Sequence, residues 1–468
     1  MPTPQSHVQH LYLQAGFGID LPGLRAHMQK SPSQLIEDLF DDARFWHSLE
    51  VPNFEMPDLM TIRQMKEEER REMQQQARRA LGTLNLAWLN QMASGRARLR
   101  EKMALFWHDH FVTRHQHAYA AQLQVNTLRE HALGKFGTLL SRVAKDPAML
   151  RFLNNQQNHK AHPNENFARE LLELFTLGRG YYTEQDIQQA ARAFTGWSSL
   201  PNGEFVFRPR WHDYGTKTFL GRRGNFDGDD ILHIILEQER TASFITRKLY
   251  RFFVNPDVDK EVVSNWAKEF YESDYDLSTL MRRMLSSDHF FEARHIGTRI
   301  KSPIEYLLNL MCMLNMRFEQ EEGAIMLQRL LGQVLLQPPS VAGWPQERAW
   351  IDSNSMMLRL KIPQALIFSS GLEVQPKAAF AGNEDAIRAG REMKRRLGAK
   401  IDWQPLLSEL RGLEEEQILA SLASWLYQLN TDPASYQWMR QHLPPSGKDE
   451  RIKWMCMRLM GTPEFQLM

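Results

Sequence analysis

Four of the chain's 16 histidines fall within one short stretch, FWHDHFVTRHQH at 106–117. Imidazole binds metal ions and exchanges protons near neutral pH. On a helix, His108 and His110 are separated by about 200° of rotation, so one ion could bind both only if the helix ended between them. The apolar residues on either side favour another arrangement, in which each imidazole is buried and hydrogen-bonded in the core. His108 and His110 are therefore candidate metal ligands with a structural alternative.

A second candidate set lies in HPNENFARELLELFTLG, residues 162–178. The proline and asparagine at its start and the glycine at its end predict a helix over 165–177. Arg169, Glu170 and Glu173 then share the face opposite the leucine and phenylalanine side chains. Beneath a second layer of structure they could hold a metal or a ligand that carries phosphate or carboxylate. Periodicity alone favours the alternative, a solvated face whose ion pairs contribute about 0.2–0.5 kcal/mol each.

A third set, in RWHDYGTKTFLG at 210–221, contains His212, Asp213 and Lys217. These residue types could exchange protons with a substrate. A direct contact between the imidazole and the carboxylate is not expected, because neighbouring side chains on a strand point to opposite faces.

Three further motifs have simpler interpretations. The acid-rich NFDGDD predicts a helix N-terminus rather than a calcium loop, because its glycine and distal glutamate are misplaced. Lys301 and Glu305 are spaced as a helical i, i+4 pair. GWP at 343–345, together with Trp350, either forms an aromatic wall for a sugar or planar ligand or, as such tryptophans more often do, pins a loop to the body.

The composition is that of a globular protein and excludes several classes. Lys and Arg total 57 against 56 Asp and Glu, so no basic field predicts nucleic acid as a partner. The two cysteines are too few for a disulfide framework. No apolar run approaches the roughly 18 residues of a membrane span. The first residues lack the pattern of a signal peptide, so we expect a cytoplasmic protein.

The predicted fold class is mainly α. We expect a large helical domain over 1–365, with a small β-hairpin near 204–221 where FVF and KTF alternate. A helical carboxy-terminal module over 375–468 is expected to pack on it. Helical periodicity and capping residues predict helices at 62–93, 97–112, 125–145, 165–177, 184–194, 229–252, 260–287, 302–316 and 321–335.

Seven motifs, in this order, resemble those of the bacterial domain of unknown function 1800 family. They are FWHDHF, DPAMLRFLNN, NENFARELLELFTLG, ARAFTGW, HDYGTKTFLG, KSPIEYL and GWP. The resemblance runs from about residue 10 to about residue 363. It implies a predominantly helical protein with no settled reaction, whose relatives often accompany a second family of unknown function, numbered 1501, that resembles alkaline phosphatases and sulfatases. Many relatives carry export signals, so export by another route stays open.

The resemblance places many polar residues on family motif positions without giving any of them a role. His115 and His117 lie outside the FWHDHF motif and are discounted. The motif positions are His108, His110, Asn164, Glu165, Arg169, Glu170, Glu173, Trp197, His212, Asp213 and Lys217.

Two functions follow as hypotheses. In the first, the chain is a metal-dependent hydrolase or oxidoreductase with a buried polar pocket. The pocket is built from His108 or His110, the Arg169–Glu170–Glu173 face and the His212–Asp213 hairpin. A divalent ion is bound by imidazole and carboxylate, and a glutamate acts as general base. In the second, the chain is a non-catalytic helical scaffold that binds the phosphatase- or sulfatase-like companion, or a polymer, through the GWP loop and the polar segment 62–80.

Overall fold

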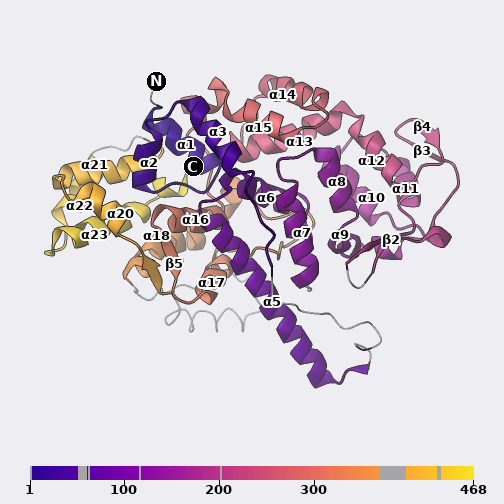
Figure 1. Ribbon diagram of the computed structural model, residues 1–468, viewed down its shortest axis with the longest axis horizontal. Coiled ribbons are helices and arrows are strands. Elements are labelled where there is room, and N and C mark those ends of the chain that lie inside the picture. Colours follow the sequence, from indigo (N-terminus) through magenta and orange to yellow (C-terminus); the bar gives the residue numbers. More distant parts are fainter. Residues whose placement is uncertain are drawn as a thin grey trace.

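The computed structural model describes residues 3–50, 61, 64–114, 118–200, 203–368, 397–429 and 434–468. Helices dominate it, as the sequence predicts, and the strands form small two-stranded antiparallel sheets (Figure 1). The first half contains α1 (Gln5–Gln14), α2 (Leu21–His27), α3 (Pro32–Asp42), α5 (Glu67–Ala93), α6 (Arg98–His110), α7 (Ala118–Glu130), α8 (Phe136–Ala144), α9 (Pro147–Phe152), α10 (Asn166–Glu170), α11 (Glu184–Ala193) and α12 (Gly228–Leu236). The second half contains α13 (Glu239–Phe253), α14 (Lys260–Glu272), α15 (Leu277–Leu285), α16 (Pro303–Met313), α17 (Glu322–Leu331), α18 (Ser353–Phe368), α20 (Gln404–Leu410), α21 (Glu415–Leu426), α22 (Ala434–Gln441) and α23 (Lys448–Met460).

Three segments that are predicted as single long helices each form two shorter helices. The segment 125–145 divides into α7 and α8 at Gly134, segment 229–252 into α12 and α13, and segment 260–287 into α14 and α15. In the last case Asp274 and Tyr275 adopt positive φ, and Asp276 then caps α15 by accepting from the Thr279 N–H. Periodicity continues across these breaks because both helices of each pair pack on the same core, so the apolar pattern alone could not locate them.

The strand prediction found the strands but not their partners. FVF is β2 (Phe205–Phe207) and pairs with β1 (Trp197–Ser199), whereas KTF is β3 (Lys217–Phe219) and pairs with β4 (Arg222–Gly224). FVF and KTF therefore do not form a hairpin with each other. A 3-10 turn at Pro209–Trp211 redirects the chain between them. The third sheet joins β5 (Met316–Phe318) to β6 (Ala399–Ile401).

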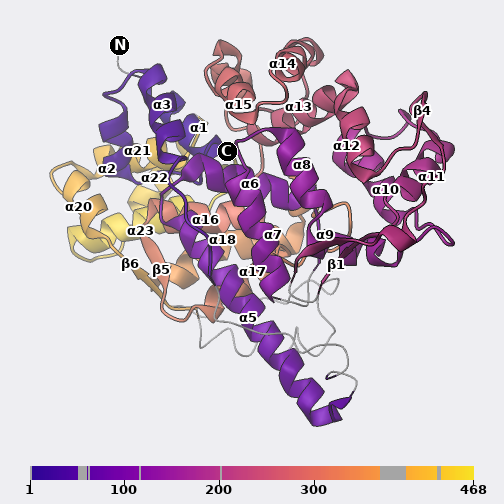
Figure 2. The ribbon, with the colours of Figure 1, turned by 45° about the vertical axis from the view of Figure 1, so that its right-hand side comes forward.

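The carboxy-terminal helices lie beside the amino-terminal ones (Figures 1 and 2). Gln9 of α1 donates to the backbone carbonyls of Trp425 and Tyr427, and α20 packs on α2. The last residues also pair with the middle of the chain, since the Lys301 N–H donates to the Gln466 carbonyl and the Arg299 N–H to that of Met468. Residues 397–468, as far as they are described, thus share a core with the rest. The division into two domains stays a prediction, because the proposed boundary near 365–375 falls largely in 369–396, outside the described residues.

Several charged side chains are buried in this core. Lys102 donates to Glu305 at 2.6 Å, and both side chains are almost fully buried. Glu101 forms a similar pair with Arg129, 2.7 Å between nitrogen and oxygen. The predicted i, i+4 pair is not formed: Lys301 donates instead to Asn309 at 2.7 Å and to the Phe465 carbonyl at 2.6 Å. Such pairs are costly to desolvate, and breaking one side leaves an uncompensated charge.

The described helices agree with the expectation that no apolar segment is long enough to span a membrane. None of them combines the length and the apolar character that a bilayer crossing requires.

Candidate metal centre

His108 and His110 are both buried at the end of α6 but contact different parts of the protein. His108 accepts a hydrogen bond from the Leu336 N–H at 3.1 Å and lies between the rings of Trp88 and Trp344. His110 faces α13 and the helical turn at Leu171–Thr176. His115 and His117 lie outside the described residues. Of the four histidines in this stretch, the two that the structure describes therefore do not share one site.

Both ring nitrogens of His110 are engaged by the protein. The Nε2 atom lies 3.1 Å from the Phe175 carbonyl, to which it donates, and Nδ1 accepts from the Lys248 ammonium at 2.9 Å. Lys248 also donates to the Leu174 carbonyl at 3.3 Å. The Leu174 and Phe175 carbonyls lie near the end of the π-helical turn Leu171–Thr176, where no further turn supplies N–H donors. His110 and Lys248 donate to them instead and so cap the turn. In this arrangement neither nitrogen of His110 is open to a metal.

The pKa values of His110 and Lys248 are shifted from their usual ranges. Burial and the adjacent Lys248 charge hold the pKa of His110 well below its usual range. Burial also lowers the pKa of Lys248 to about 8, opposed by the carboxylate of Asp109. Asp109 itself anchors the GWP loop, accepting from the Trp344 N–H at 2.9 Å and from Gln346 at 3.1 Å. Asp109 thus fastens the GWP loop to the body through the Trp344 backbone, and the Trp344 side chain is buried.

The Arg169, Glu170 and Glu173 face lies at the surface. Arg169 pairs with Glu165 and Glu184, and its side chain is 36% exposed. Glu173 pairs with Arg179 at 2.5 Å. Burial, and then the neighbouring Glu173 carboxylate, raise the pKa of Glu170, which is half-buried beside these pairs. The helix face is thus only partly exposed, with the Glu173 side chain 18% exposed, and Arg169 and Glu173 are held in ion pairs with other residues.

The His212, Asp213 and Lys217 set forms a separate hydrogen-bonding network. His212 Nδ1 lies 2.9 Å from the Thr195 carbonyl, Asp213 pairs with Arg192 at 2.7 Å, and Lys217 donates to the Asp213 carbonyl at 2.5 Å.

This network and the Arg169 face attach to opposite ends of α11, at Arg192 and Glu184. Eight residues of helix separate those ends by about 12 Å. The structure therefore does not bring the two predicted sets into one pocket.

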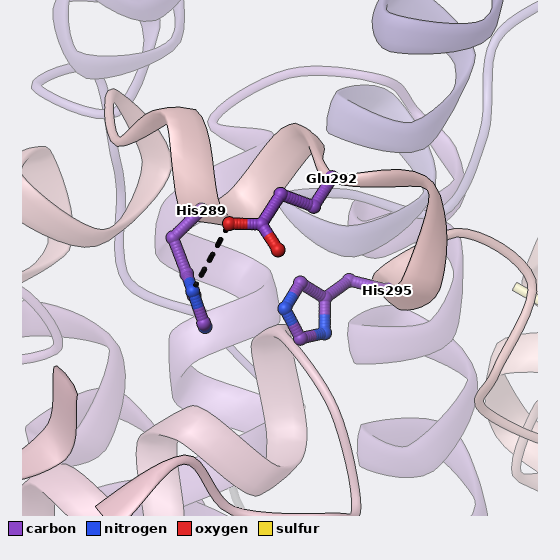
Figure 3. A group of neighbouring side chains, drawn as sticks. All are labelled: His289, Glu292 and His295. Carbon is purple, nitrogen blue, oxygen red and sulfur yellow. Dashed lines mark ion pairs between the residues drawn. The ribbon is translucent and has the colours of Figure 1, made fainter. Parts of the chain in front are cut away.

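A different group meets the requirements of a metal site. Among the residues that the structure describes, His289, Glu292 and His295 have ligand atoms that all lie within 4.8 Å of one another (Figure 3). His289 lies in the 3-10 turn Asp288–Phe291 and His295 ends the next one, Ala293–His295, whereas Glu292 joins the two turns in an extended conformation. The bend at Glu292, and not one regular helix, brings the three side chains together. Phe290, fully buried, fixes the first turn to the core.

The three side chains differ in their access to solvent. His295 is 2% exposed, whereas the His289 side chain is 11% and that of Glu292 44% exposed. Glu292 Oε1 lies 3.5 Å from His289 Nδ1, and its other oxygen accepts from Arg294 at 2.6 Å. Burial lowers the pKa of His289, and burial together with the neighbouring His289 lowers that of His295 to about 4. Neutral imidazole is the form that binds metal ions.

Neighbouring residues orient both rings. The His289 Nε2 atom lies 2.9 Å from the Tyr250 hydroxyl, which leaves Nδ1 facing Glu292. The His295 Nδ1 atom accepts from the Asn255 amide at 2.9 Å. Its Nε2 atom is buried without a hydrogen-bond partner and is turned toward the other two side chains (Figure 3). The atoms that face one another are thus His289 Nδ1, Glu292 Oε1 and His295 Nε2. Arg294 also lies 3.4 Å from His289 Nδ1, so its guanidinium must move aside for an ion to bind there.

Asn255 sets the position of the proton on His295. Its amide orientation is fixed by two backbone groups, since Nδ2 donates to the Arg294 carbonyl at 3.1 Å and Oδ1 accepts from the Asp257 N–H at 2.9 Å. Nδ2 can only donate to His295, so the neutral ring carries its proton on Nε2. A metal on Nε2 requires that proton to move to Nδ1 and the amide to turn its oxygen toward the ring.

The sequence contains this group as H-x-x-E-x-x-H within SSDHFFEARH, residues 286–295. Spacing alone does not reveal it, because on an α-helix a three-residue spacing drifts by about 60° per step. The three side chains meet because the chain bends at Glu292 between two short 3-10 turns.

With this geometry established, the comparisons place the chain in a family. A family model described as Protein of unknown function (DUF1800) matches residues 10–467, so the chain belongs to that family. The match extends beyond residue 363, where the resemblance of the motifs ended, consistent with the pairing of residues 466–468 against residues 299–301. The search of curated proteins and the search of solved structures gave no match.

Proposed function

We propose that this DUF1800 protein is a metal-dependent enzyme whose divalent ion binds His289, Glu292 and His295. Two imidazoles and one carboxylate form the donor set of zinc hydrolases and of non-haem iron oxygenases, and both leave coordination positions open to water, oxygen or substrate. The carrying observation is the buried, unpartnered His295 Nε2, which points toward two further ligand atoms at the protein surface.

The surroundings support this assignment in three ways. The tyrosine contact places the His289 ring before any ion binds, which reduces the entropy lost on binding. Glu292 is partly exposed, so a bound ion would be accessible to a substrate from outside. The carboxylate supplies a negative charge that compensates part of the ion's charge.

The metal supplies the chemistry, and its identity separates the reaction classes. A redox-inert ion such as zinc would lower the pKa of bound water and make hydrolysis the reaction, whereas iron would make it oxidation. Arg294, paired with Glu292, is placed to bind an anionic part of a substrate near the ion.

Elemental analysis of protein purified without added metal tests this proposal. We expect close to one transition-metal ion per chain, reduced at least ten-fold in Glu292→Gln and His295→Gln. The matched control is Glu237→Gln, at the residue that caps the end of α12. It removes a carboxylate that also lies 3.4 Å from a histidine, His233, but in a pair without a third ligand. Wild-type protein that holds no ion and takes up none from micromolar zinc, iron or manganese would contradict the proposal.

One observation favours a second candidate function. The first part of α5, from Glu67 to Arg79, projects from the body with Ala77 as its first buried residue (Figures 1 and 2). We propose that this exposed polar arm serves a scaffold that binds a phosphatase- or sulfatase-like protein of the 1501 family. Co-purification with that protein, lost when surface charges of the arm are reversed but retained in Glu292→Gln, is the expected result.

A further inference from the structure

Two motifs that the proposed metal centre leaves unused meet at a surface groove. The segment His162–Asn164 precedes the exposed helix face, and Trp211 belongs to the 3-10 turn before His212. The Lys160 N–H donates to the Trp211 carbonyl at 2.8 Å, and His159 forms a β-bridge with His162. A groove of about 660 Å³ lies along this junction. Its volume falls within the range of small-ligand sites, roughly 300–1,000 Å³.

The chemistry of the lining residues is neutral and hydrogen-bonding. Among the described residues that line the groove, none carries a carboxylate, ammonium or guanidinium group. The polar side chains are amides and imidazoles, which offer both donors and acceptors. These amides and imidazoles belong to Gln156, Gln157, His159, His162 and Asn164, and they line the groove together with the indole of Trp211.

The groove also has an aromatic surface at a fixed position. Trp211 is 36% exposed, unusual for so large an apolar side chain. The Arg208 guanidinium lies 4.7 Å from the centre of the Trp211 ring, and the His159 ring stands edge-on to it at 6.1 Å. These contacts hold the indole without removing it from solvent.

The base of the groove is rigid. The fully buried Asn158 donates to the Ala191 carbonyl at 2.8 Å and accepts from the Asn164 N–H at 2.9 Å, which ties the loop to α11. Gln156 donates to the Ser199 hydroxyl at 2.8 Å, which fixes its amide. Such preorganisation reduces the entropy that a ligand loses on binding.

We propose that this groove binds a neutral carbohydrate chain. Sugar hydroxyls donate and accept at the same atom, which amides and imidazoles match, and the apolar C–H face of a pyranose ring packs on an indole. No lining side chain is a cation, so an anionic ligand would have only the Arg208 guanidinium on the Trp211 ring to contact, and a wholly apolar ligand would leave the amides without partners.

Calorimetric titration with hexasaccharides of glucose and of N-acetylglucosamine tests the proposal. We expect at least one of them to bind and Trp211→Ala to weaken that binding at least ten-fold. Trp438→Ala is the matched control, because Trp438 is 50% exposed and also stacks on a histidine, His442, outside the groove. Gln157→Ala, at an exposed position, tests the groove by a second route if Trp211→Ala does not fold.

Three results would overturn the proposal. The first is no heat of binding with either hexasaccharide at millimolar concentration. The second is binding that Trp211→Ala and Gln157→Ala leave unchanged. The third is uptake of zinc alone, abolished by His162→Ala, without sugar binding, which would make the two histidines a metal site instead. None of these results bears on the ion at His295, since Glu292→Gln is expected to bind sugar normally.

Discussion

Asn255→Asp should strengthen metal binding at His295, because the natural amide disfavours the required tautomer. In the wild-type protein, a metal on His295 Nε2 forces the amide to rotate, which gives up its hydrogen bonds to the Asp257 N–H and the Arg294 carbonyl. Two such bonds contribute about 2–3 kcal/mol together. An aspartate accepts from the Asp257 N–H with one oxygen and from a protonated Nδ1 with the other, and so loses only the contact with the Arg294 carbonyl.

The expected gain is about ten- to 100-fold in zinc affinity, the range by which such second-layer contacts alter metal binding. Competition with a chromophoric chelator at constant pH measures it. Asn126→Asp is the control, because the Asn126 amide also bridges two backbone groups, both of Leu49, and the same charge is added away from the centre. Equal or weaker affinity in Asn255→Asp, with an unchanged melting temperature, would refute the tautomer argument.

Three further predictions concern buried and exposed charges. Lys102→Met removes the closer cationic partner of the buried Glu305 carboxylate and leaves it Arg299 at 3.4 Å, so it should cost up to about 3–5 kcal/mol of unfolding free energy in urea titrations, with a smaller loss when Glu305→Leu is added; a loss below about 1 kcal/mol would contradict this. The pKa of Lys248 is about 8 when folded and roughly 10.4 when unfolded, so the unfolded chain binds more protons between these values and stability should rise with pH there, by up to about 3 kcal/mol from this group. Lys248→Met should lack that increment in urea curves at pH 8 and 10.5, and an identical pH response would rule out the assignment. Glu170→Gln should change stability by less than about 1 kcal/mol and leave the metal content unaltered, since it lies among surface ion pairs.

Much of the helical fold could be predicted from local signals. Asp227 caps α12 and Ser302 caps α16, each at the start of an apolar pattern that periodicity reveals. Helix breaks and strand partners could not be predicted. FVF pairs with β1 rather than with KTF, because the turn at Pro209–Trp211 redirects the chain.

The partners of the candidate site residues could not be predicted from sequence spacing, for a more specific physical reason. Arg169 and Asp213 are ionisable residues that could share one pocket, yet they pair with residues at opposite ends of α11. His110 contacts a carbonyl of a π-helical turn and the Lys248 ammonium, and sequence spacing indicates neither contact. Conversely, the His289 group depends on a bend at Glu292 between two 3-10 turns, which an α-helical periodicity test does not detect.

Anomalous diffraction from crystals of the wild-type protein, soaked in zinc or manganese and measured at the absorption edge of the ion, tests the metal centre most directly. The account predicts one dominant peak bounded by His289 Nδ1, Glu292 Oε1 and His295 Nε2, absent from crystals of Glu292→Gln. No peak at that position, or a dominant peak beside His159 and His162 instead, would contradict it.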